Sequence, residues 1–383
     1  MPAASILIKP ASSNCNIDCK YCFYKCLSSN REKYSMGFMS PETLEKVVIR
    51  AFEYAEHHVT FAFQGGEPTL SGLPFFREVV KLQEKYRPSG ISVENTIQTN
   101  GILIDREWAR FLAENHFLVG LSLDGPQKLH DRYRRDVKDS PTFEKVMQTI
   151  ALFDEFHIDY NILSVVTADT CDKAGYLYKF YKRNQFQFIQ LIPCMDETNR
   201  GKSGPGSEFT ITAEKYGKFL CEIFDLWYED FVQDRAAGRI PMDIRMFSNL
   251  AQLAAGYPAE ECGMNGRCTC YFVVEGDGSV YPCDFYCMDK WKLGSVDESF
   301  NSMINSDKAK EFVSGSCTVN EKCKSCPHFR LCRGGCRRWR ESGGENLSLF
   351  GLCPAYEIFF EHASDRIGKL GQIILDSYGE YRG

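Results

Sequence analysis

The first half of the chain alternates short runs of apolar, β-branched and aromatic residues with longer segments whose apolar positions recur at the helical period. The short runs are bounded by Gly, Pro or Asn, which is typical of buried strands. They predict six strands, at 5–9, 59–64, 92–98, 118–123, 159–166 and 186–192. The segments between them predict helices at about 41–57, 74–87, 106–115, 142–156 and 173–184.

Six strands that alternate with helices indicate βα units, because neighbouring parallel strands need crossover connections. Six units are too few to close an eight-stranded barrel. The pattern therefore favours an α/β fold built as a partial, open (β/α)6 barrel of the TIM type. A doubly wound sheet is also compatible with the pattern.

The pattern changes after a glycine-rich loop at 201–207 and a predicted helix at 213–233. From 262 to 353 the chain is rich in Cys, Gly and Arg, with only short predicted strands at 271–275 and 279–282. Such a segment assembles little aliphatic core, so we expect bound metal to stabilise it instead. Three parts are expected: a partial barrel at 1–235, a Cys-rich domain at 236–353 and a helix within 354–383 that packs back on the body.

Composition is that of a globular protein, with 44% hydrophobic and 25% charged residues among 383. Lys and Arg total 45 and Asp and Glu total 51, so the net charge of −6 argues against nucleic acid or an anionic membrane as the main partner. The arginines between Arg330 and Arg340 lie among cysteines and are expected to form a solvated face or to pair with acidic groups and cluster charge. No apolar run approaches the ~20 residues of a membrane span, and the N-terminus lacks a long signal-peptide core. We therefore expect a cytoplasmic protein.

The chain contains 18 cysteines. In a reducing cytoplasm, cysteines at short spacings more often bind metal or do redox chemistry than form disulfides. The first group is Cys15-x3-Cys19-x2-Cys22, directly after the first predicted strand. Three thiolates at this spacing can hold one iron–sulfur cube and leave one iron open to a small molecule. The alternatives are a zinc site, for which a fourth ligand and any nearby His are lacking, and a closed cluster that uses Cys26 as its fourth ligand.

A second set of eight cysteines lies in the C-terminal part, and eight are enough for two complete clusters with four cysteine ligands each. Two structural zinc ions would satisfy the same count. The eight are Cys262, Cys268, Cys283, Cys323, Cys326, Cys332, Cys336 and Cys353. The remaining seven are expected to be small buried apolar residues: Cys26, Cys171, Cys194, Cys221, Cys270, Cys287 and Cys317.

The segment Cys15-x3-Cys19-x-Tyr21-Cys22 resembles the signature of radical S-adenosylmethionine (radical SAM) enzymes, and Gln64-Gly65-Gly66-Glu67-Pro68 resembles their GGEP motif. The C-terminal spacing is similar to the SPASM extension of this family, which carries two auxiliary clusters. The resemblance implies three [4Fe–4S] clusters, with S-adenosylmethionine as cosubstrate. It assigns Cys15, Cys19 and Cys22 to the open cluster, Cys262, Cys268, Cys283 and Cys336 to the first auxiliary cluster, and Cys323, Cys326, Cys332 and Cys353 to the second.

Longer segments resemble the anaerobic sulfatase-maturating enzymes over nearly the whole chain: IKPASSNCNIDCKYCFY, FAFQGGEPTL, QTNGILID, FLVGLSLDGP, FDLWYEDF, CGMNGRCTCYFVVEGDGSVYPCDFY and FRLCRGGCRRWR. Such enzymes oxidise a Cys or Ser of an unfolded or nascent sulfatase, within a Cys/Ser-x-Pro/Ala-x-Arg motif, to Cα-formylglycine (3-oxoalanine). The co-products are 5′-deoxyadenosine and methionine. The resemblance implies an oxidoreductase supplied by a low-potential donor of flavodoxin or ferredoxin type, and a monomer is the default state.

Two other functions remain open for this cysteine pattern. The first is a SPASM radical SAM enzyme that installs crosslinks in a ribosomally made peptide. The second is an electron carrier with three closed clusters, although a carrier has no use for the GGEP segment.

The resemblance also assigns roles to single residues. Asp284, directly after Cys283, is expected to be the base that takes a proton from the substrate. Contacts with the cosubstrate are implied for Tyr21, Gly66, Glu67, Ser122, Arg134 and Met195. Tyr24, Gln64 and Gln98 lie at the ends of segments that face the expected mouth of the barrel, so we expect them to contact the substrate peptide.

Overall fold

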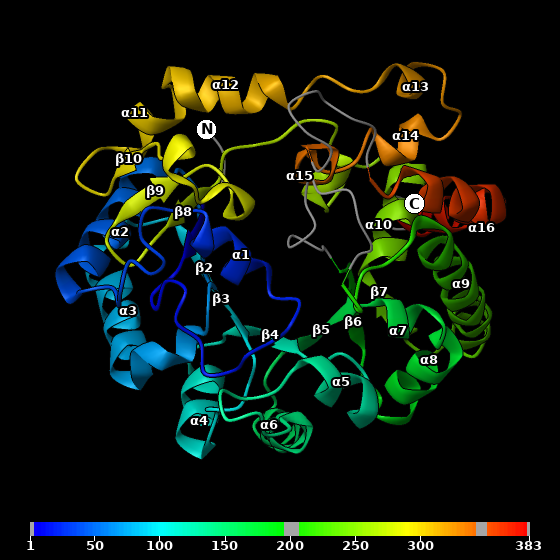
Figure 1. The fold of residues 1–383 in the computed structure, drawn as a ribbon, viewed down its shortest axis with the longest axis horizontal. Helices are drawn as coiled ribbons and strands as arrows, with labels where there is room; N and C mark the ends of the chain where they lie inside the picture. The colour runs from blue at the N-terminus through cyan, green and yellow to red at the C-terminus, as the bar shows by residue number, and fades with distance from the viewer. Residues whose placement is uncertain (1–3, 195–206, 342–350, 381–383) are drawn as a thin grey trace. The chain divides into compact units, whose positions relative to one another are not determined.

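The computed structural model of the protein describes residues 4–194, 207–341 and 351–380 (Figure 1). The chain forms two compact units, each built from several segments. The first comprises Met1–Leu123, His130–Asn161 and Thr269–Val313, and the second comprises Asp124–Leu129, Ile162–Cys268 and Ser314–Gly383. The division into parts at 235 and 353 stays a prediction.

All six predicted strands are present within a few residues of their expected positions. They are β1 (Ala4–Ile8), β2 (His58–Phe63), β3 (Ser92–Thr99), β4 (Leu118–Ser122), β5 (Tyr160–Val166) and β6 (Phe188–Pro193). In the first unit, β1, β2, β3 and β4 pair in parallel in that order. In the second unit, β5 pairs in parallel with β6, and β6 with β7 (Asp243–Ile244). Parallel strands joined by helices confirm the predicted α/β class.

Two of the predicted helices begin directly after residues that the capping rules favour. Ser40 caps α2 (Pro41–Tyr54), because its side chain accepts a hydrogen bond from the Thr43 backbone N–H. Asp105 caps α4 (Arg106–Glu114) in the same way, through the Trp108 N–H. The other helices expected in this half are α3 (Gly72–Tyr86), α6 (Phe143–Glu155) and α8 (Ala174–Arg183). The short helices α1 (Phe23–Ser29), α5 (Gln127–Tyr133) and α7 (Ala168–Cys171) were not predicted.

Three short strands of the Cys-rich region join the sheet of the first unit. β8 (Phe272–Val274) pairs in parallel with β1, and Ile8 lies opposite Val274. β9 (Ser279–Tyr281) pairs antiparallel with β8, and β10 (Gly294–Ser295) pairs antiparallel with β9. Both β8 and β9 were predicted as strands, but an alternating pattern identifies a buried face and not the partner strand. The pairing brings the carboxyl ends of β8, β1 and β2 together.

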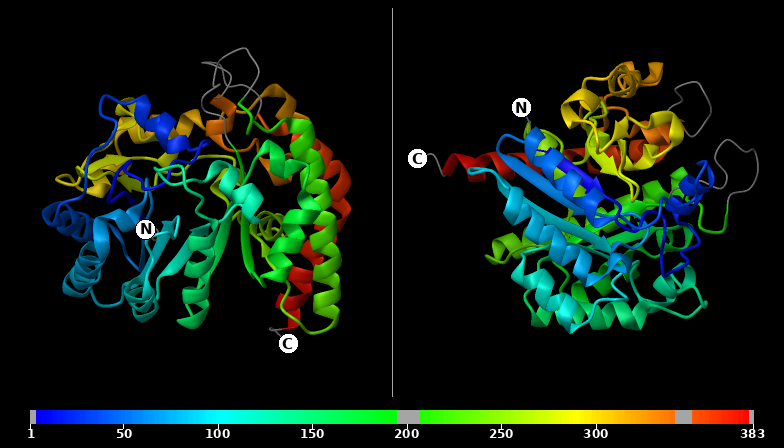
Figure 2. Two further views of the ribbon diagram at one scale, coloured as in Figure 1. Left: turned by 60° about the horizontal axis from the view of Figure 1, so that its bottom comes forward. Right: turned by 90° about the vertical axis from the view of Figure 1, so that its left-hand side faces the viewer.

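In the second unit, α9 (Ala213–Ala236) and α16 (Cys353–Glu380) lie side by side, as Figures 1 and 2 show. A Cβ added at Gly217 would lie 3.0 Å from the Ala355 carbonyl oxygen, so glycine permits this close packing. The ring centroids of Phe224 and Phe359 are 5.5 Å apart. The predicted C-terminal helix therefore packs back on the chain, against α9 and against Arg245–Ala254.

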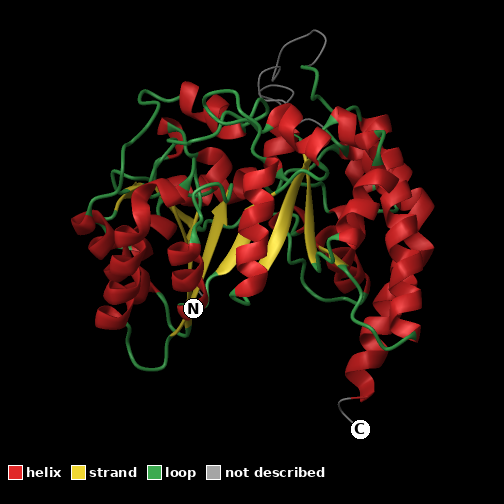
Figure 3. Ribbon diagram, turned by 90° about the horizontal axis from the view of Figure 1, so that it is seen from below, coloured by secondary structure: helices red, strands yellow, loops and turns green. Residues whose placement is uncertain are grey.

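Short elements complete the chain, and Figure 3 distinguishes helices, strands and loops. They are α10 (Arg245–Ala254), α11 (Phe300–Ile304), α12 (Asp307–Gly315), α13 (Glu321–Lys324), α14 (Phe329–Cys332) and α15 (Arg337–Arg340), with the 3₁₀ turns η1 (Pro68–Ser71), η3 (Cys262–Met264), η4 (Asp284–Tyr286) and η5 (Asp289–Trp291). Within the described ranges, no helix is both long and apolar enough to cross a membrane.

Candidate active site

Three polar residues follow three neighbouring strands of the first unit. Lys9 follows β1, Gln64 follows β2 and Glu275 follows β8. The Lys9 N–H donates to the Val274 carbonyl at 2.8 Å, and the Gln64 N–H donates to the Ile8 carbonyl at 3.0 Å. Parallel strands end at a common edge, and open α/β sheets bind ligands outside the carboxyl ends of their strands. This edge is therefore the candidate active site.

Asp284, the expected base, lies at this edge in η4, directly after Cys283. Its side chain is buried, and the Tyr24 hydroxyl donates to its Oδ2 at 2.5 Å. Gln64 Nε2 donates to the Tyr24 oxygen at 2.8 Å and lies 3.5 Å from Asp284 Oδ2. Burial raises the pKa of Tyr24, and the nearby Asp284 charge raises it further, so the phenol remains a proton donor in this contact. The structure thus brings together three residues that the sequence analysis singled out separately.

A buried ammonium lies on the other side of Asp284. Lys9 Nζ is 2.9 Å from Asp284 Oδ1 and 3.5 Å from Glu275 Oε1, and it lies 4.6 Å from the centroid of the Tyr24 ring. Arg31 Nη1 donates to the same Glu275 oxygen at 2.6 Å. Burial alone would lower the pKa of Lys9, but the charges of Asp284, Cys287 and Glu275 outweigh it, and the net shift is upward.

Sequence reasoning missed Lys9, Arg31 and Glu275. For Lys9 and Glu275 a signal was present, because each is a charged residue at the end of a strand that is otherwise buried and apolar. Arg31 carried no such signal, since it lies in the loop after α1.

The three N-terminal cysteines lie between β1 and α1. Burial, with smaller contributions from the charges of Glu67 and Cys22, raises the pKa of Cys15 to about 11. Burial also raises the pKa of Cys22. Arg134 Nη1 lies 3.8 Å from Cys19 Sγ. Cys19 is buried and Cys15 and Cys22 are half-buried. Three such thiols that follow one strand end form a donor set that suits an iron–sulfur cluster better than a hydrated ion.

The glycine of the GGEP segment lies directly against the cysteine loop. The Gly66 N–H donates to the Ser12 carbonyl at 2.8 Å, and the Glu67 N–H donates to the Asn14 carbonyl at 2.8 Å. A Cβ at Gly66 would lie 2.0 Å from the Asn14 oxygen, so any larger residue would push the two loops apart. Glycine therefore lets the GGEP loop pack directly against the loop that carries the cysteines.

Glu67 is buried, and its carboxylate is fully engaged by its own chain. Oε1 accepts hydrogen bonds from the Thr69 N–H at 3.0 Å, the Thr69 hydroxyl at 2.6 Å and the Thr99 hydroxyl at 2.7 Å. Oε2 accepts one from the Asn100 N–H at 2.8 Å. Burial raises the pKa of Glu67, although these hydrogen bonds oppose the rise. Glu67 thus fixes the loop that carries Gly66.

The other expected cosubstrate contacts are placed as follows. Arg134 is buried, and its guanidinium carbon lies 5.5 Å from the centroid of the Tyr21 ring. Ser122 is buried at the end of β4. Gln98 is half-buried in β3, opposite Gly120 of β4. Met195 lies outside the described residues.

The second unit gathers its cysteines in two groups. Burial raises the pKa of Cys336 to about 12, with further contributions from the charges of Cys262 and Cys268. Burial likewise raises the pKa of Cys332 to about 12, with contributions from Cys353, Cys323 and Cys326. A Cβ added at Gly263 would lie 3.4 Å from Cys336 Cβ, so Cys336 lies beside the segment that carries Cys262, although it is closer in sequence to the later cysteines.

Cys283 belongs to the first unit, where its Sγ is 3.6 Å from the Tyr271 hydroxyl. Among residues 4–194, 207–341 and 351–380, no three His, Cys, Asp or Glu side chains are grouped so as to hold a single metal ion.

The arginines near these cysteines are bonded to the chain. Arg340 is buried, and its guanidinium donates to the carbonyls of Thr318 at 2.5 Å and Ser316 at 2.7 Å. The Ser316 hydroxyl accepts a hydrogen bond from the Cys268 N–H at 2.7 Å. Arg337 pairs with Glu341, which is one of the two arrangements expected for this run. Arg330 is exposed, but Arg338 and Arg340 are buried, so the run does not form a solvated face.

Comparison with known proteins agrees with this geometry. The Radical SAM superfamily matches residues 10–170, and the SPASM iron-sulfur cluster-binding domain matches residues 262–327. A cysteine-type anaerobic sulfatase-maturating enzyme of Clostridium perfringens is 46% identical over 369 residues, which are 96% of this chain and 98% of that protein. A serine-type anaerobic sulfatase-maturating enzyme of Bacteroides thetaiotaomicron is 31% identical over 379 residues, covering 94% of this chain and 89% of that protein.

A solved structure, native anSMEcpe with bound AdoMet and Cp18Cys peptide, is similar with a TM-score of 0.90 and 44% identity. The match covers 97% of this chain and 100% of that chain. Fold and site together define a radical SAM enzyme with a SPASM domain. More narrowly, the chain belongs to the anaerobic sulfatase-maturating enzymes.

These matches confirm several predictions. The fold class is correct, and the chain is a radical SAM oxidoreductase. Its cofactors are three [4Fe–4S] clusters, with S-adenosylmethionine as cosubstrate. The assignment of particular residues to these groups stays a prediction.

Proposed function

We propose that this chain oxidises a cysteine of an unfolded or nascent sulfatase to Cα-formylglycine, with 5′-deoxyadenosine and methionine as co-products. The observation that carries the proposal is the buried Asp284 carboxylate, which the chain holds directly beside Cys283 and bonds to Tyr24. The preference for cysteine is supported by identity, because cysteine-type relatives share 44–46% of residues and serine-type relatives 29–31%.

Cys15, Cys19 and Cys22 are proposed to hold the cluster that binds the cosubstrate. With both groups bound, one-electron reduction of S-adenosylmethionine would release methionine and a 5′-deoxyadenosyl radical, which would take a hydrogen atom from Cβ of the target residue. The cosubstrate contacts are proposed to come from Gly66 by its backbone and from Tyr21, Ser122, Arg134 and Met195. Glu67 acts behind Gly66, since its own oxygens are occupied by Thr69, Thr99 and Asn100.

Asp284 is proposed to accept the thiol proton of the target cysteine. Proton transfer needs a base within hydrogen-bond reach, and the Tyr24 and Gln64 contacts aim one carboxylate oxygen at the shared edge of the strands. Loss of the proton and of one electron from the substrate radical leaves a thioaldehyde. Water then replaces sulfur by oxygen and releases hydrogen sulfide.

The electron is proposed to leave through an auxiliary cluster. Cys262, Cys268, Cys283 and Cys336 are the ligands proposed for the first, and Cys323, Cys326, Cys332 and Cys353 for the second. Because Asp284 directly follows Cys283, the proton acceptor and the electron acceptor would be close together. Tyr24, Gln64 and Gln98 are proposed to contact the peptide, which carries a Cys-x-Pro-x-Arg or related motif.

The remaining features of the proposal concern the setting of the reaction. A flavodoxin- or ferredoxin-type protein is proposed as the low-potential electron donor, because the reaction begins with a one-electron reduction. The protein is proposed to lie in the cytoplasm, since clustered reduced cysteines suit that compartment. A monomer is proposed as its default state.

A peptide assay tests this function. Anaerobically reconstituted protein is incubated with a Cys-x-Pro-x-Arg peptide and with the matched Ser peptide, and both are analysed by mass spectrometry. We expect the cysteine peptide to exchange sulfur for oxygen with loss of two hydrogens, faster than the serine peptide loses two hydrogens. An unchanged peptide together with abundant 5′-deoxyadenosine would instead favour an enzyme that crosslinks other peptides.

A further inference from the structure

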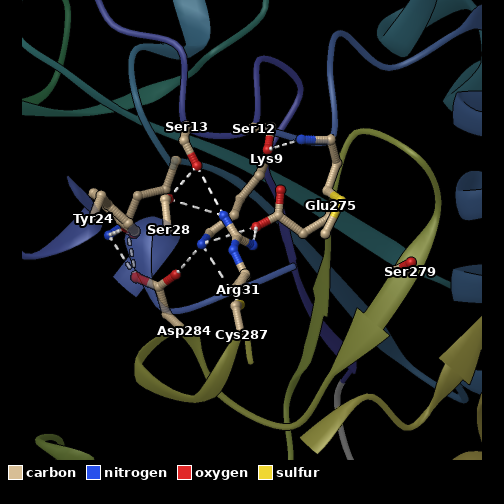
Figure 4. Close-up of polar contacts among 12 residues, drawn as sticks. Lys9, Ser12, Ser13, Tyr24, Ser28, Arg31, Glu275, Ser279, Asp284 and Cys287 are labelled. Carbon is tan, nitrogen blue, oxygen red and sulfur yellow. Dashed lines mark hydrogen bonds and ion pairs between the residues drawn. The ribbon is translucent and has the colours of Figure 1, made fainter. Parts of the chain in front are cut away.

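We propose that Lys9 is the positioning residue of the proton acceptor: its ammonium fixes one oxygen of Asp284 so that the other faces Tyr24, Gln64 and the substrate. This inference rests on the proposed role of Asp284. The two oxygens have different partners, because Lys9 Nζ lies 2.9 Å from Oδ1 and the Tyr24 hydroxyl lies 2.5 Å from Oδ2 (Figure 4).

The position of Lys9 is itself fixed. Its backbone N–H is bonded to the Val274 carbonyl of β8, and its side chain is only 2% exposed. Nζ lies over the Tyr24 ring and 3.5 Å from Cys287 Sγ. A charge held by a strand end and by packing can orient a flexible carboxylate, whereas a solvent-exposed lysine could not.

Arg31 pairs with Glu275 and so leaves the ammonium of Lys9 to pair mainly with Asp284. Lys9, Arg31, Glu275 and Asp284 form a buried group of two cations and two carboxylates. Arg31 lies 2.6 Å from Glu275 Oε1, while Lys9 is 3.5 Å from the same oxygen. Arg31 therefore neutralises Glu275, and the shorter contact of Lys9 goes to Asp284. Burial alone would raise the pKa of Glu275, but Lys9 and Arg31 hold it below its usual value, so Glu275 remains an anion that balances the group.

A buried ion pair can also be only a structural feature, so the test needs a readout that folding alone does not change. That readout is the amount of modified peptide formed per 5′-deoxyadenosine released by the reconstituted holoenzyme. Lys9→Met removes the charge and keeps the length of the side chain. We expect it to lower this ratio at least tenfold. The KM for S-adenosylmethionine and the iron content should remain at wild-type values.

Lys9→Arg retains a positive charge and should restore the ratio to within about threefold of wild type. Lys46→Met is the matched control, because Lys46 pairs with Asp297 at 2.6 Å on the exposed surface of the same unit and should have no effect. The double variant Lys9→Met, Glu275→Gln removes one cation and one carboxylate, so the buried group stays balanced. It should fold with full iron and show the same loss of coupling as Lys9→Met.

Three results separate this inference from the function on which it rests. If the wild type forms no formylglycine, the proposed function fails. If Asp284→Asn converts peptide at the wild-type rate, the base assignment fails. If Asp284→Asn is defective but the iron-loaded double variant retains the wild-type ratio of modified peptide to 5′-deoxyadenosine, the role of Lys9 is overturned. The role is also overturned if Lys9→Arg lowers this ratio as much as Lys9→Met does. Adding Lys9→Met to Asp284→Asn should cause no further loss, because Lys9 acts through Asp284.

Discussion

Tyr24 and Asp284 are 260 positions apart in the chain, and the phenol of the first donates to the carboxylate of the second at 2.5 Å. Tyr24 lies two residues after Cys22, and Asp284 lies directly after Cys283. The hydrogen bond therefore joins the segments that carry two sets of proposed cluster ligands. It also leaves Asp284 with a neutral donor on the oxygen opposite Lys9.

The Tyr24 hydroxyl is expected to contribute to peptide oxidation. Tyr24→Phe removes the donor to Asp284 Oδ2 and the acceptor for Gln64, and a buried hydrogen bond to a charged group is worth about 1.5–3 kcal/mol. We therefore expect peptide turnover to fall by about tenfold or more, while 5′-deoxyadenosine release continues. Both products are quantified by mass spectrometry from the same sample.

Tyr86 provides a matched control for this variant. Its hydroxyl donates to Glu45 at 2.5 Å, so the chemical pair is the same, but Glu45 is partly exposed and lies on α2. Tyr86→Phe should leave turnover unchanged. Equal effects of the two substitutions would mean that the Tyr24 contact has no special role.

Local sequence features predicted the βα units well. The strand at Leu118–Ser122 and the helix that Asp105 caps are determined by apolar spacing and by one side-chain acceptor, and both were placed within a residue or two. The cysteine spacing and the GGEP segment likewise pointed to the family. These signals are short-range, so a single sequence reveals them.

The buried charges around Asp284 could not be predicted in the same way. Lys9 meets Glu275 only because β1 pairs with β8, and no local pattern specifies that pairing. Cys336 is similar, since its spacing groups it with Cys332 and only the family resemblance placed it with Cys262. Such relationships depend on tertiary contacts between distant segments.

Glu67 is expected to support cosubstrate binding without touching the cosubstrate. Each of its oxygens accepts a hydrogen bond from a backbone N–H, one of Thr69 and one of Asn100. In Glu67→Gln the amide nitrogen must face one of these donors, so the free energy of unfolding should fall by about 1–3 kcal/mol. Thermal unfolding measures this loss, and equilibrium dialysis of the holoenzyme should show weaker S-adenosylmethionine binding.

An exposed glutamate provides the control for this experiment. Glu107 pairs with Arg77 on the surface, where an ion pair contributes only about 0.2–1 kcal/mol. Glu107→Gln should leave cosubstrate binding unchanged. Unaltered binding in Glu67→Gln would show that the Gly66 loop does not depend on this carboxylate.

The grouping of the C-terminal cysteines gives a spectroscopic prediction. Cys336→Ala and Cys268→Ala should affect the same auxiliary cluster, because Cys336 lies beside the Cys262 segment and the charges of Cys262 and Cys268 raise the pKa of its thiol. Cys332→Ala should affect the other cluster, with Cys323, Cys326 and Cys353. Each variant should lose up to about four irons, the content of one cubane cluster.

Electron paramagnetic resonance of the reduced variants distinguishes the two clusters. Cys336→Ala and Cys268→Ala are expected to lose the same signal, and Cys332→Ala a different one. A common loss in Cys336→Ala and Cys332→Ala would contradict the interleaved assignment.

The most direct test of the account is the Asp284→Asn variant, assayed for both products in one reaction. Reconstituted variant and wild type are given S-adenosylmethionine, reductant and a Cys-x-Pro-x-Arg peptide, and 5′-deoxyadenosine and peptide mass are measured together. We predict that the variant still cleaves the cosubstrate but that its formation of formylglycine falls by roughly 100-fold or more, as expected when a general base is removed. Formation of formylglycine at the wild-type rate would contradict it.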